Sequence, residues 1–252
     1  MSTNDKGRIR ISVVTVTYNS AATVAQTVRS VLDQTYPAYE YIIIDGGSDD
    51  STVDTVKSFA DEFEAAGTKL VVVSEPDKGI YDAMNKGVTR ASGDMVGIIN
   101  SDDWYEKDAL KIVADTYRSE PFDLFWADLR MIMPGGRSFI KHARCRSYAT
   151  SRDWNHPTTF IAKHIYERYL YRLDSIHDDY DLILRLKRDN VREKVVNKVI
   201  ANFRMEGVSH KRSAASAIKS VKDKYSIYRR NGYSRLYIFE CVAVEAGKLI
   251  IG

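Results

Sequence analysis

The stretch I-S-V-V-T-V-T-Y-N-S at residues 11–20 decides the fold of this chain. Its first seven residues carry no charge and are rich in β-branched side chains, which is typical of a strand buried on both faces of a sheet. Polar residues 18–20 follow, and then Val24, Val28 and Val31 recur at helical spacing. A strand that passes through a short loop into a helix is one step of an α/β fold.

The same step recurs along the first hundred residues. Apolar strands are predicted at 41–44, 70–73 and 95–99, and helices at 53–63 and 80–91. This alternation predicts an α/β fold with a Rossmann-like, mostly parallel central sheet flanked by helices. After about residue 120 the pattern is less regular. It predicts a strand at 124–133 that turns into 138–142, helices at 163–171 and 182–188, and a strand at 195–203.

The composition indicates one large globular domain. The 252 residues are 44% hydrophobic and 28% charged, and the net charge is only +3, so nucleic acid is not an expected partner. Residues 1–140 hold 14 Lys and Arg against 22 Asp and Glu, a net charge of −8, whereas residues 141–252 hold 23 against 12, a net charge of +11. We therefore expect the C-terminal part to face an anionic partner.

Cysteine usage and the N-terminus indicate the compartment. Cys145 and Cys241 have neither the spacing of metal ligands nor the density of a disulfide scaffold. The polar N-terminus lacks a signal-peptide pattern, and no uncharged run reaches the roughly 20 apolar residues that span a bilayer. We expect a cytoplasmic protein.

Polar loops follow three of the predicted strands at their C-terminal ends, where open α/β sheets bind ligands. They read D-G-G-S-D-D-S-T at 45–52, D-K-G-I-Y-D-A-M-N-K-G at 77–87 and N-S-D-D at 100–103. No G-x-G-x-x-G and no P-loop motif accompanies them, which argues against ordinary dinucleotide and P-loop sites. The adjacent carboxylates of Asp102 and Asp103 suit Mg²⁺ or Mn²⁺, although S-D-D could instead cap a helix that begins near Glu106.

Together with the segment V-V-T-V-T-Y-N at 13–19, these loops resemble the family 2 glycosyltransferases of the GT-A fold. The resemblance covers roughly residues 10–210. It implies a catalytic domain at 1–210, with a nucleotide-sugar-binding half at about 1–105 and an acceptor-binding, base-bearing half at about 106–210. Residues 211–252 remain as a tail.

The resemblance implies a role for each matching residue. The residues that line the nucleotide base are Thr17, Tyr18 and Asn19, and Asp45 accepts a hydrogen bond from the base. The segment that closes over the nucleotide and donor sugar contributes Asp77, Lys78, Asp82 and Asn85. In the S-D-D motif, Ser101 contributes at most a hydroxyl, Asp102 contacts ribose or a metal-bound water, and Asp103 is the direct metal ligand. Asp45 and Asp82 could instead be ordinary turn or cap residues.

An inverting transfer needs a base for the acceptor hydroxyl and an electrophile for the leaving diphosphate. The segment H-D-D-Y-D-L at 177–182 resembles the family's E-D-Y-D-L segment, which implies Asp179 as the base. Asp178 or Asp181 could take that role, and all three carboxylates could serve only the helix dipole. By the same resemblance, the residues that could close over the pyrophosphate are Arg204, Ser209, His210 and Lys211, and His210 could approach the metal. Trp154 and His156 match a region that faces the acceptor, where Trp154 could stack on a sugar or simply pack.

These residues, together with the family resemblance, imply a metal-dependent, inverting glycosyltransferase, with the following donor, cofactor and acceptor. The expected donor is a nucleotide sugar, UDP-linked, the cofactor is Mn²⁺ or Mg²⁺, and the acceptor is a saccharide or lipid-linked saccharide in surface polysaccharide assembly. A nucleotidyltransferase shares this kind of sheet, but residues 18–22 lack the glycine-rich, basic loop that it would need. A non-catalytic module that binds sugar nucleotides is the other alternative.

The tail at 211–252 is predicted to be helical, basic and amphipathic. Residues 210–235 carry eight Lys and Arg against one acid, Asp223. Apolar and aromatic side chains recur among them at helical spacing, at Ile218, Val221, Tyr225 and Tyr228. Such a helix could bind the anionic inner face of the cell membrane, or its apolar stripe could pack on the catalytic domain with its lysines solvated.

Overall fold

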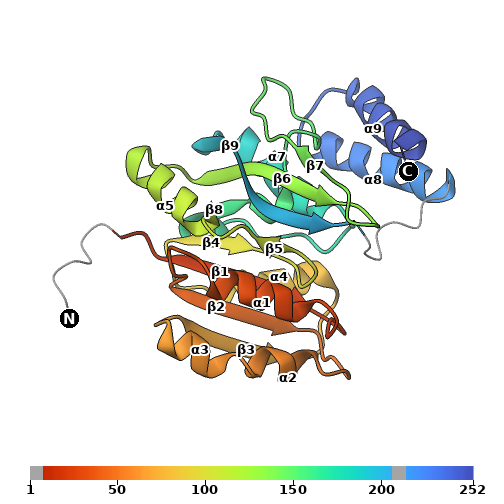
Figure 1. Cartoon of the computed structure of the whole chain (residues 1–252). Coiled ribbons are helices and arrows are strands. Elements are labelled where there is room, and N and C mark those ends of the chain that lie inside the picture. The colour runs from red at the N-terminus through yellow and green to blue at the C-terminus, as the bar shows by residue number, and fades with distance from the viewer. Residues whose placement is uncertain (1–7, 206–213, 252) are drawn as a thin grey trace.

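The computed structural model describes residues 8–205 and 214–251, so the predicted roles of Ser209, His210 and Lys211 lie outside the described residues. The chain is built on one central sheet with the strand order β3-β2-β1-β4-β8-β6-β9-β5, and β7 pairs with β6 (Figure 1). The predicted α/β fold with helices around a central sheet is confirmed.

The N-terminal half of the sheet is parallel. Strand β1 (Ile11–Thr17) lies between β2 (Glu40–Asp45) and β4 (Met95–Ile98), and β3 (Lys69–Ser74) extends the sheet beyond β2. Every residue of β1, β2 and β4 is buried, as their apolar sequences predict. Because these strands run in the same direction, the loops that follow them meet at one edge.

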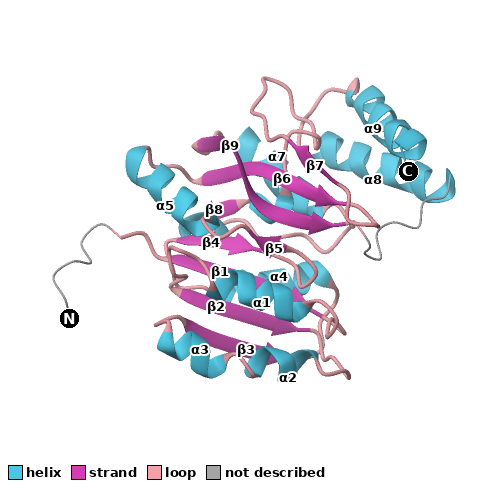
Figure 2. Cartoon of the chain, viewed as in Figure 1, coloured by secondary structure: helices cyan, strands magenta, loops and turns pink. Residues whose placement is uncertain are grey.

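Helices cover both faces of this half. Helices α1 (Val24–Leu32), α2 (Thr52–Lys57) and α3 (Ala60–Ala65) connect strands that progress in one direction, whereas α4 (Ile80–Arg90) returns to β4. Right-handed crossovers place α4 on the opposite face, and Figure 2 shows α1 in front of the sheet and α4 behind it. A Cβ atom at Gly87 would lie 2.3 Å from the Val14 side chain, so glycine is what allows α4 to pack this closely on β1.

Beyond β4 the sheet is mixed. Strand β8 (Phe160–Ala162) runs antiparallel to β4 and to β6 (Leu124–Ile132), while β9 (Glu193–Arg204) is parallel to β6. The remaining strands of this half are β5 (Trp104–Tyr105) and β7 (Ser138–Lys141), and the short 3₁₀ helix η1 spans His156–Thr158. Helix α5 (Ala109–Ser119) leads into β6, and α6 (Lys163–Tyr166) and α7 (Asp178–Arg188) lie between β8 and β9.

Two predicted helices are shorter than their patterns indicate. The helix at 53–63 is divided into α2 and α3, because the Ser58 hydroxyl donates to the carbonyl of Thr55 and the Phe59 N–H donates to the carbonyl of Val56, only three residues back. The helix at 163–171 ends at Tyr166. Farther along, the Asn85 side chain holds both the N–H and the C=O of Tyr171, which fixes that backbone outside a helix.

The C-terminal segment is helical, as predicted, and forms α8 (Ala214–Arg230) and α9 (Tyr237–Ile251). Tyr228 of α8 is 2% exposed, and Val221 and Tyr225 pack against the core. The apolar stripe of α8 therefore lies against the rest of the protein, with the exception of Ile218, which is exposed. No helix in the described part of the chain is long and apolar enough to cross a membrane.

Candidate active site

A cleft of about 730 Å³ opens where the loops after β1, β3 and β4 meet the end of β9. Its lining includes many of the residues singled out in the sequence, namely Thr17, Tyr18, Asn19, Asp77, Ser101, Asp102 and Arg204. The fold therefore brings together side chains that lie up to 187 positions apart in the sequence, from Thr17 to Arg204. The position agrees with the rule that open α/β sheets bind ligands at the C-terminal ends of their strands.

The loop after β1 is tied to the loop after β2. Asn19 has a φ of 47°, a left-handed conformation that asparagine tolerates better than most residues. Its N–H donates to the Ser48 hydroxyl at 2.8 Å, and its side-chain oxygen accepts from the Asp49 N–H at 3.0 Å. Tyr18 next to it is 63% exposed, so its ring is accessible from the cleft that it lines.

Asp45 is fully buried and does not belong to the cleft lining. One oxygen accepts from the N–H groups of Gly47 and Ser48 and from the Ser74 hydroxyl, and the other accepts from the Ser48 hydroxyl. The carboxylate therefore holds the loop after β2 in shape, which is the turn-residue role left open by the sequence.

The segment from Asp77 to Asn85 forms the start of α4 and its anchor. Asp77 accepts from the Gly79 N–H at 2.7 Å, and Asp82 accepts from the Lys78 N–H at 3.0 Å, so both carboxylates shape the turn into the helix. The Lys78 side chain is exposed outside this cleft. Asn85 faces Tyr171 and joins α4 to the segment that precedes α7.

Asp102 and Asp103 form the acidic end of β4. Asp102 lines the cleft and is partly buried, whereas Asp103 is fully buried beside it. One Asp103 oxygen accepts from the Arg204 N–H at 3.1 Å, and the other is buried without a hydrogen-bond partner among the described residues. Burial and the charge of Asp102 raise the pKa of Asp103 well above its ordinary value, and burial also raises the pKa of Asp102.

This pair fits a divalent cation that is shared with a phosphate ligand. An unpartnered carboxylate oxygen, next to a second carboxylate, is a place where a cation would relieve both desolvation and repulsion. Within residues 8–205 and 214–251, no group of three His, Cys, Asp or Glu side chains could enclose a metal. Mg²⁺ and Mn²⁺ do not need such a cage, because they use one or two carboxylates and take their other ligands from water and phosphates.

Among the described residues, arginine side chains bind two of the three carboxylates at the start of α7 and leave the third, Asp179, without an arginine partner. Asp178 and Asp181 are fully buried, and Arg230 of α8 donates to both, at 3.2 and 2.9 Å. Asp181 also accepts from Arg185 and Asn231. Asp179 is half-buried and accepts from the Tyr180 N–H, and burial raises its pKa, while the nearby His156 lowers it. A raised pKa gives a carboxylate more affinity for a proton.

Asp179 lies outside the lining of the main cleft, in the neighbourhood of α4. Burial and the charge of Asp179 raise the pKa of Tyr81, whose hydroxyl donates to the carbonyl of Ile176 at 2.9 Å. A second hollow of about 490 Å³, lined by Tyr81 and Ile176, shares Gly79 and Ile80 with the main cleft. The start of α4 therefore separates the acidic end of β4 from the start of α7.

Trp154 packs in the interior and is only 7% exposed. Its ring lies 6.0 Å from that of Tyr180 and 5.8 Å from that of His156, measured between centroids. Packing, rather than an open stacking surface, is therefore its role in this structure. His156 is half-buried, and desolvation lowers its pKa.

Sequence reasoning missed several residues of this region. The sequence indicates Arg230 only as one of the basic residues of the tail, and it predicts no role for Tyr81 within the motif at 77–87. The cleft lining also includes Ser20, Asn100 and Phe203. Each of these three directly adjoins a predicted site residue in the sequence, so adjacency was the available signal. Nothing local could have paired Arg230 with the acidic helix start, because 49 positions separate it from Asp181.

Comparisons with known proteins agree on one family. The model of glycosyl transferase family 2 matches residues 12–175. A glycosyltransferase of Mycobacterium tuberculosis named for PGL/p-HBAD biosynthesis is 36% identical over 122 residues, which are 48% of this chain and 46% of that protein. The chain thus spans about half the length of the curated relatives it matches.

Two solved structures share the fold. TarS of Staphylococcus aureus in complex with UDP-GlcNAc has a TM-score of 0.66 at 19% identity, over 94% of this chain and 72% of that one. A mannosyltransferase of Pyrobaculum calidifontis in complex with GDP-Man and Mn²⁺ has a TM-score of 0.66 at 16% identity, over 97% and 75%. These likenesses confirm the GT-A arrangement expected from the sequence.

Proposed function

The chain belongs to glycosyl transferase family 2, and from this membership we propose that it transfers a sugar from a nucleotide-sugar donor to a saccharide or lipid-linked saccharide acceptor, with inversion. The observation that carries the proposal is the position of the Asp102 and Asp103 pair at the edge of a cleft large enough for a nucleotide sugar. In this proposal residues 1–210 are the catalytic domain, and Arg230, in the described part of the tail, donates to Asp178 and Asp181 of its second half.

The donor occupies the main cleft in this proposal. Thr17, Tyr18 and Asn19 receive the base, because they line the cleft together and Tyr18 presents an accessible ring. Asp45 holds the neighbouring loop, and a direct contact with the base would require its carboxylate to exchange one of its hydroxyl donors. A UDP-linked donor is proposed, and TarS, which has this fold, is solved in complex with UDP-GlcNAc.

The diphosphate lies between the acidic end of β4 and the start of α4. Asp103 would hold the divalent cation, Asp102 would contact ribose or cation-bound water, and Ser101 would contribute at most its hydroxyl. When bound, Mn²⁺ or Mg²⁺ supplies positive charge that stabilises the leaving diphosphate. Arg204 lines the same cleft, and its guanidinium rests over the Trp104 ring at 5.2 Å, which positions a second positive charge near the phosphates.

The donor sugar is enclosed by the start of α4, where Asp77, Lys78 and Asp82 shape the turn and Asn85 anchors the helix. Asp179 is the base: it accepts the proton of the acceptor hydroxyl as that oxygen bonds to the anomeric carbon and the bond to the diphosphate oxygen breaks. The pairing of Asp178 and Asp181 with Arg230 supports this choice, because it leaves Asp179 as the carboxylate not already neutralised by that arginine.

The acceptor is proposed to belong to surface polysaccharide or glycolipid assembly at the inner face of the cell membrane. The name of the mycobacterial relative, which refers to PGL/p-HBAD biosynthesis, supports a role of this kind. The charge of +11 over residues 141–252 supports an anionic partner on the acceptor side.

Release of free UDP from a panel of UDP-sugars, with and without Mn²⁺, tests the proposed function. We expect slow hydrolysis of one UDP-sugar that depends on the cation and accelerates with a suitable acceptor. A nucleotidyltransferase would instead exchange pyrophosphate, and a binding module would show thermal stabilisation by the nucleotide sugar without turnover. Either of these results would overturn the proposal.

A further inference from the structure

The outer face of α9 is apolar. In the part of α9 whose side chains the structure describes, the exposed positions are Phe239, Val242, Ala243 and Ala246, and Leu236 just before the helix is exposed as well. These positions follow helical spacing and lie on one face. Leu236 and Phe239 are each 70% exposed, so two large apolar side chains of the described residues face solvent on the same side of the helix.

The acidic residues of the same helix point away from that face. Glu245 is only 7% exposed and pairs with the buried Lys224 of α8 at 2.6 Å. Glu240 hydrogen-bonds with the Thr150 hydroxyl, in the loop that follows β7. The outward face therefore carries no acid in the described part of α9, which is the reverse of an ordinary surface helix.

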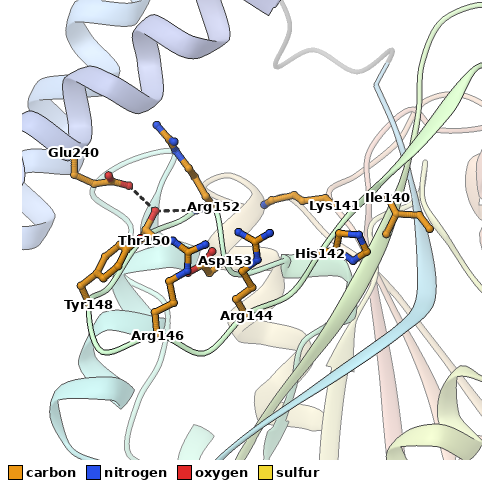
Figure 3. Close-up of a pocket in the computed structure, with 10 residues that line it drawn as sticks. All are labelled: Ile140, Lys141, His142, Arg144, Arg146, Tyr148, Thr150, Arg152, Asp153 and Glu240. Carbon is orange, nitrogen blue, oxygen red and sulfur yellow. Dashed lines mark hydrogen bonds and ion pairs between the residues drawn. The ribbon is translucent and has the colours of Figure 1, made fainter.

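A cationic hollow of about 310 Å³ lies beside α9, and Glu240 of α9 contributes to its lining. Figure 3 shows the ends of Lys141, Arg144 and Arg146 around the same space, while Arg152 extends toward α9. Arg146 pairs with Asp153 at 3.1 Å. The exposed guanidinium groups of Arg144 and Arg152 make no ion pair within the described residues, so their charge is not neutralised there.

We propose that this surface, formed by the outer face of α9 together with Arg144 and Arg152, binds an anionic lipid bilayer. The apolar side chains enter the interfacial region, and the arginines contact lipid phosphates. A second copy of the chain is a poorer occupant, because a two-fold contact through α9 would bring two cationic hollows together. The proposal rests on the proposed function, whose acceptor is assembled at the inner face of the cell membrane, and it defines the surface with which the protein would contact that membrane.

This surface is narrower than the one that the sequence suggested, which included the basic stripe of α8 as well as the later part of the tail at 211–252. On α8, Tyr225 and Tyr228 of the apolar stripe pack inside the protein, whereas α9 has apolar residues exposed on its outer face. Variants in α8 and in α9 can therefore show which of the two helices contacts the membrane.

Sedimentation of the full chain with vesicles tests the proposal. We expect binding to phosphatidylcholine vesicles that contain phosphatidylglycerol, weak binding to phosphatidylcholine alone, and release as the salt concentration rises. The double variant Arg144→Gln/Arg152→Gln should weaken binding about 30-fold, since each basic residue near an anionic surface contributes about 1 kcal/mol and every 1.4 kcal/mol is tenfold. The double variant Leu236→Ser/Phe239→Ser should weaken it at least tenfold.

The matched control is Ile218→Ser/Lys222→Gln on α8, which removes one exposed apolar and one exposed basic residue and should leave binding unchanged. Loss of binding in this control, or equal binding of the wild type to both kinds of vesicle, would overturn the proposal.

Inorganic phosphate provides a second test. If it abolishes the arginine-dependent binding, and the α9 variant binds as well as the wild type, the arginines form a site for a free anion and the proposal is wrong. A dimer that only the α9 variant dissociates, without vesicle binding by the wild type, would identify a contact between copies. The assay contains neither donor nor acceptor, so its failure leaves the proposed transferase activity untouched.

Discussion

Replacing Arg230 by Met should loosen the start of α7 and destabilise the whole protein. Arg230 lies at the end of α8, and its guanidinium donates to Asp174, Asp178 and Asp181. Asp178 and Asp181 are fully buried, so they depend on protein groups for the stabilisation that water would give. Methionine retains much of the side-chain volume and removes the charge.

The expected loss is about 3 kcal/mol. Breaking a buried ion pair by removing one partner costs about 3–5 kcal/mol. The lower end of this range applies here because other groups remain bound: Arg185 and Asn231 still bind Asp181, and two backbone N–H groups still bind Asp178. The contact with Asp174 adds little, since that carboxylate is 60% exposed and screened by solvent. For a chain of this size, such a loss lowers Tm by about 6–12 °C.

Thermal and urea unfolding of Arg230→Met, beside Arg229→Gln as the control, would measure this loss. Arg229 is exposed and hydrogen-bonds to a backbone carbonyl, so its replacement should change stability by less than about 0.5 kcal/mol. Arg230→Met should also lower kcat, because Asp179 lies between the two carboxylates that Arg230 holds. A variant as stable as the control would refute the argument that Arg230 neutralises this helix start.

Three further predictions concern the site and the sheet. Asp103→Ala should abolish Mn²⁺-dependent turnover and leave a folded protein, since it removes an oxygen ligand; full turnover would exclude Asp103 as the ligand. Asp179→Asn should lower kcat by about 100-fold or more with donor affinity retained, because only a carboxylate accepts the proton. For the same reason, wild-type activity should rise with pH through the raised pKa of Asp179. An effect confined to Asp178→Asn or Asp181→Asn would assign the role of base to that neighbour. Gly97→Ala should destabilise the sheet by about 1–3 kcal/mol, because the new Cβ would lie 2.3 Å from the Phe160 ring, whereas Gly247→Ala in α9 meets nothing within 4 Å and should be neutral or stabilising in a melting experiment.

The sequence alone determined the parallel half of the sheet. Buried strands such as β1 and β2 are read from continuous apolar runs, because burial on both faces requires every side chain to be apolar or internally paired. The same runs locate the polar loops at one edge, so the gathering of Tyr18, Asp77 and Asp102 around a cleft followed from strand order and direction.

Where the local sequence allows more than one role for a residue, only the tertiary structure decided between them. Three carboxylates at the start of α7 look alike in sequence, but Arg230 of α8 binds Asp178 and Asp181, which distinguishes Asp179 from its neighbours. The sequence allows Trp154 either to stack on a sugar or to pack in the interior, and the structure shows that it packs against Tyr180. Helical periodicity shows that α9 has two faces, but which face is covered depends on contacts such as Glu245 with Lys224, made by residues distant in the chain. Local sequence encodes backbone preference and the spacing of faces, whereas long-range packing determines which charges are neutralised and which surfaces stay exposed.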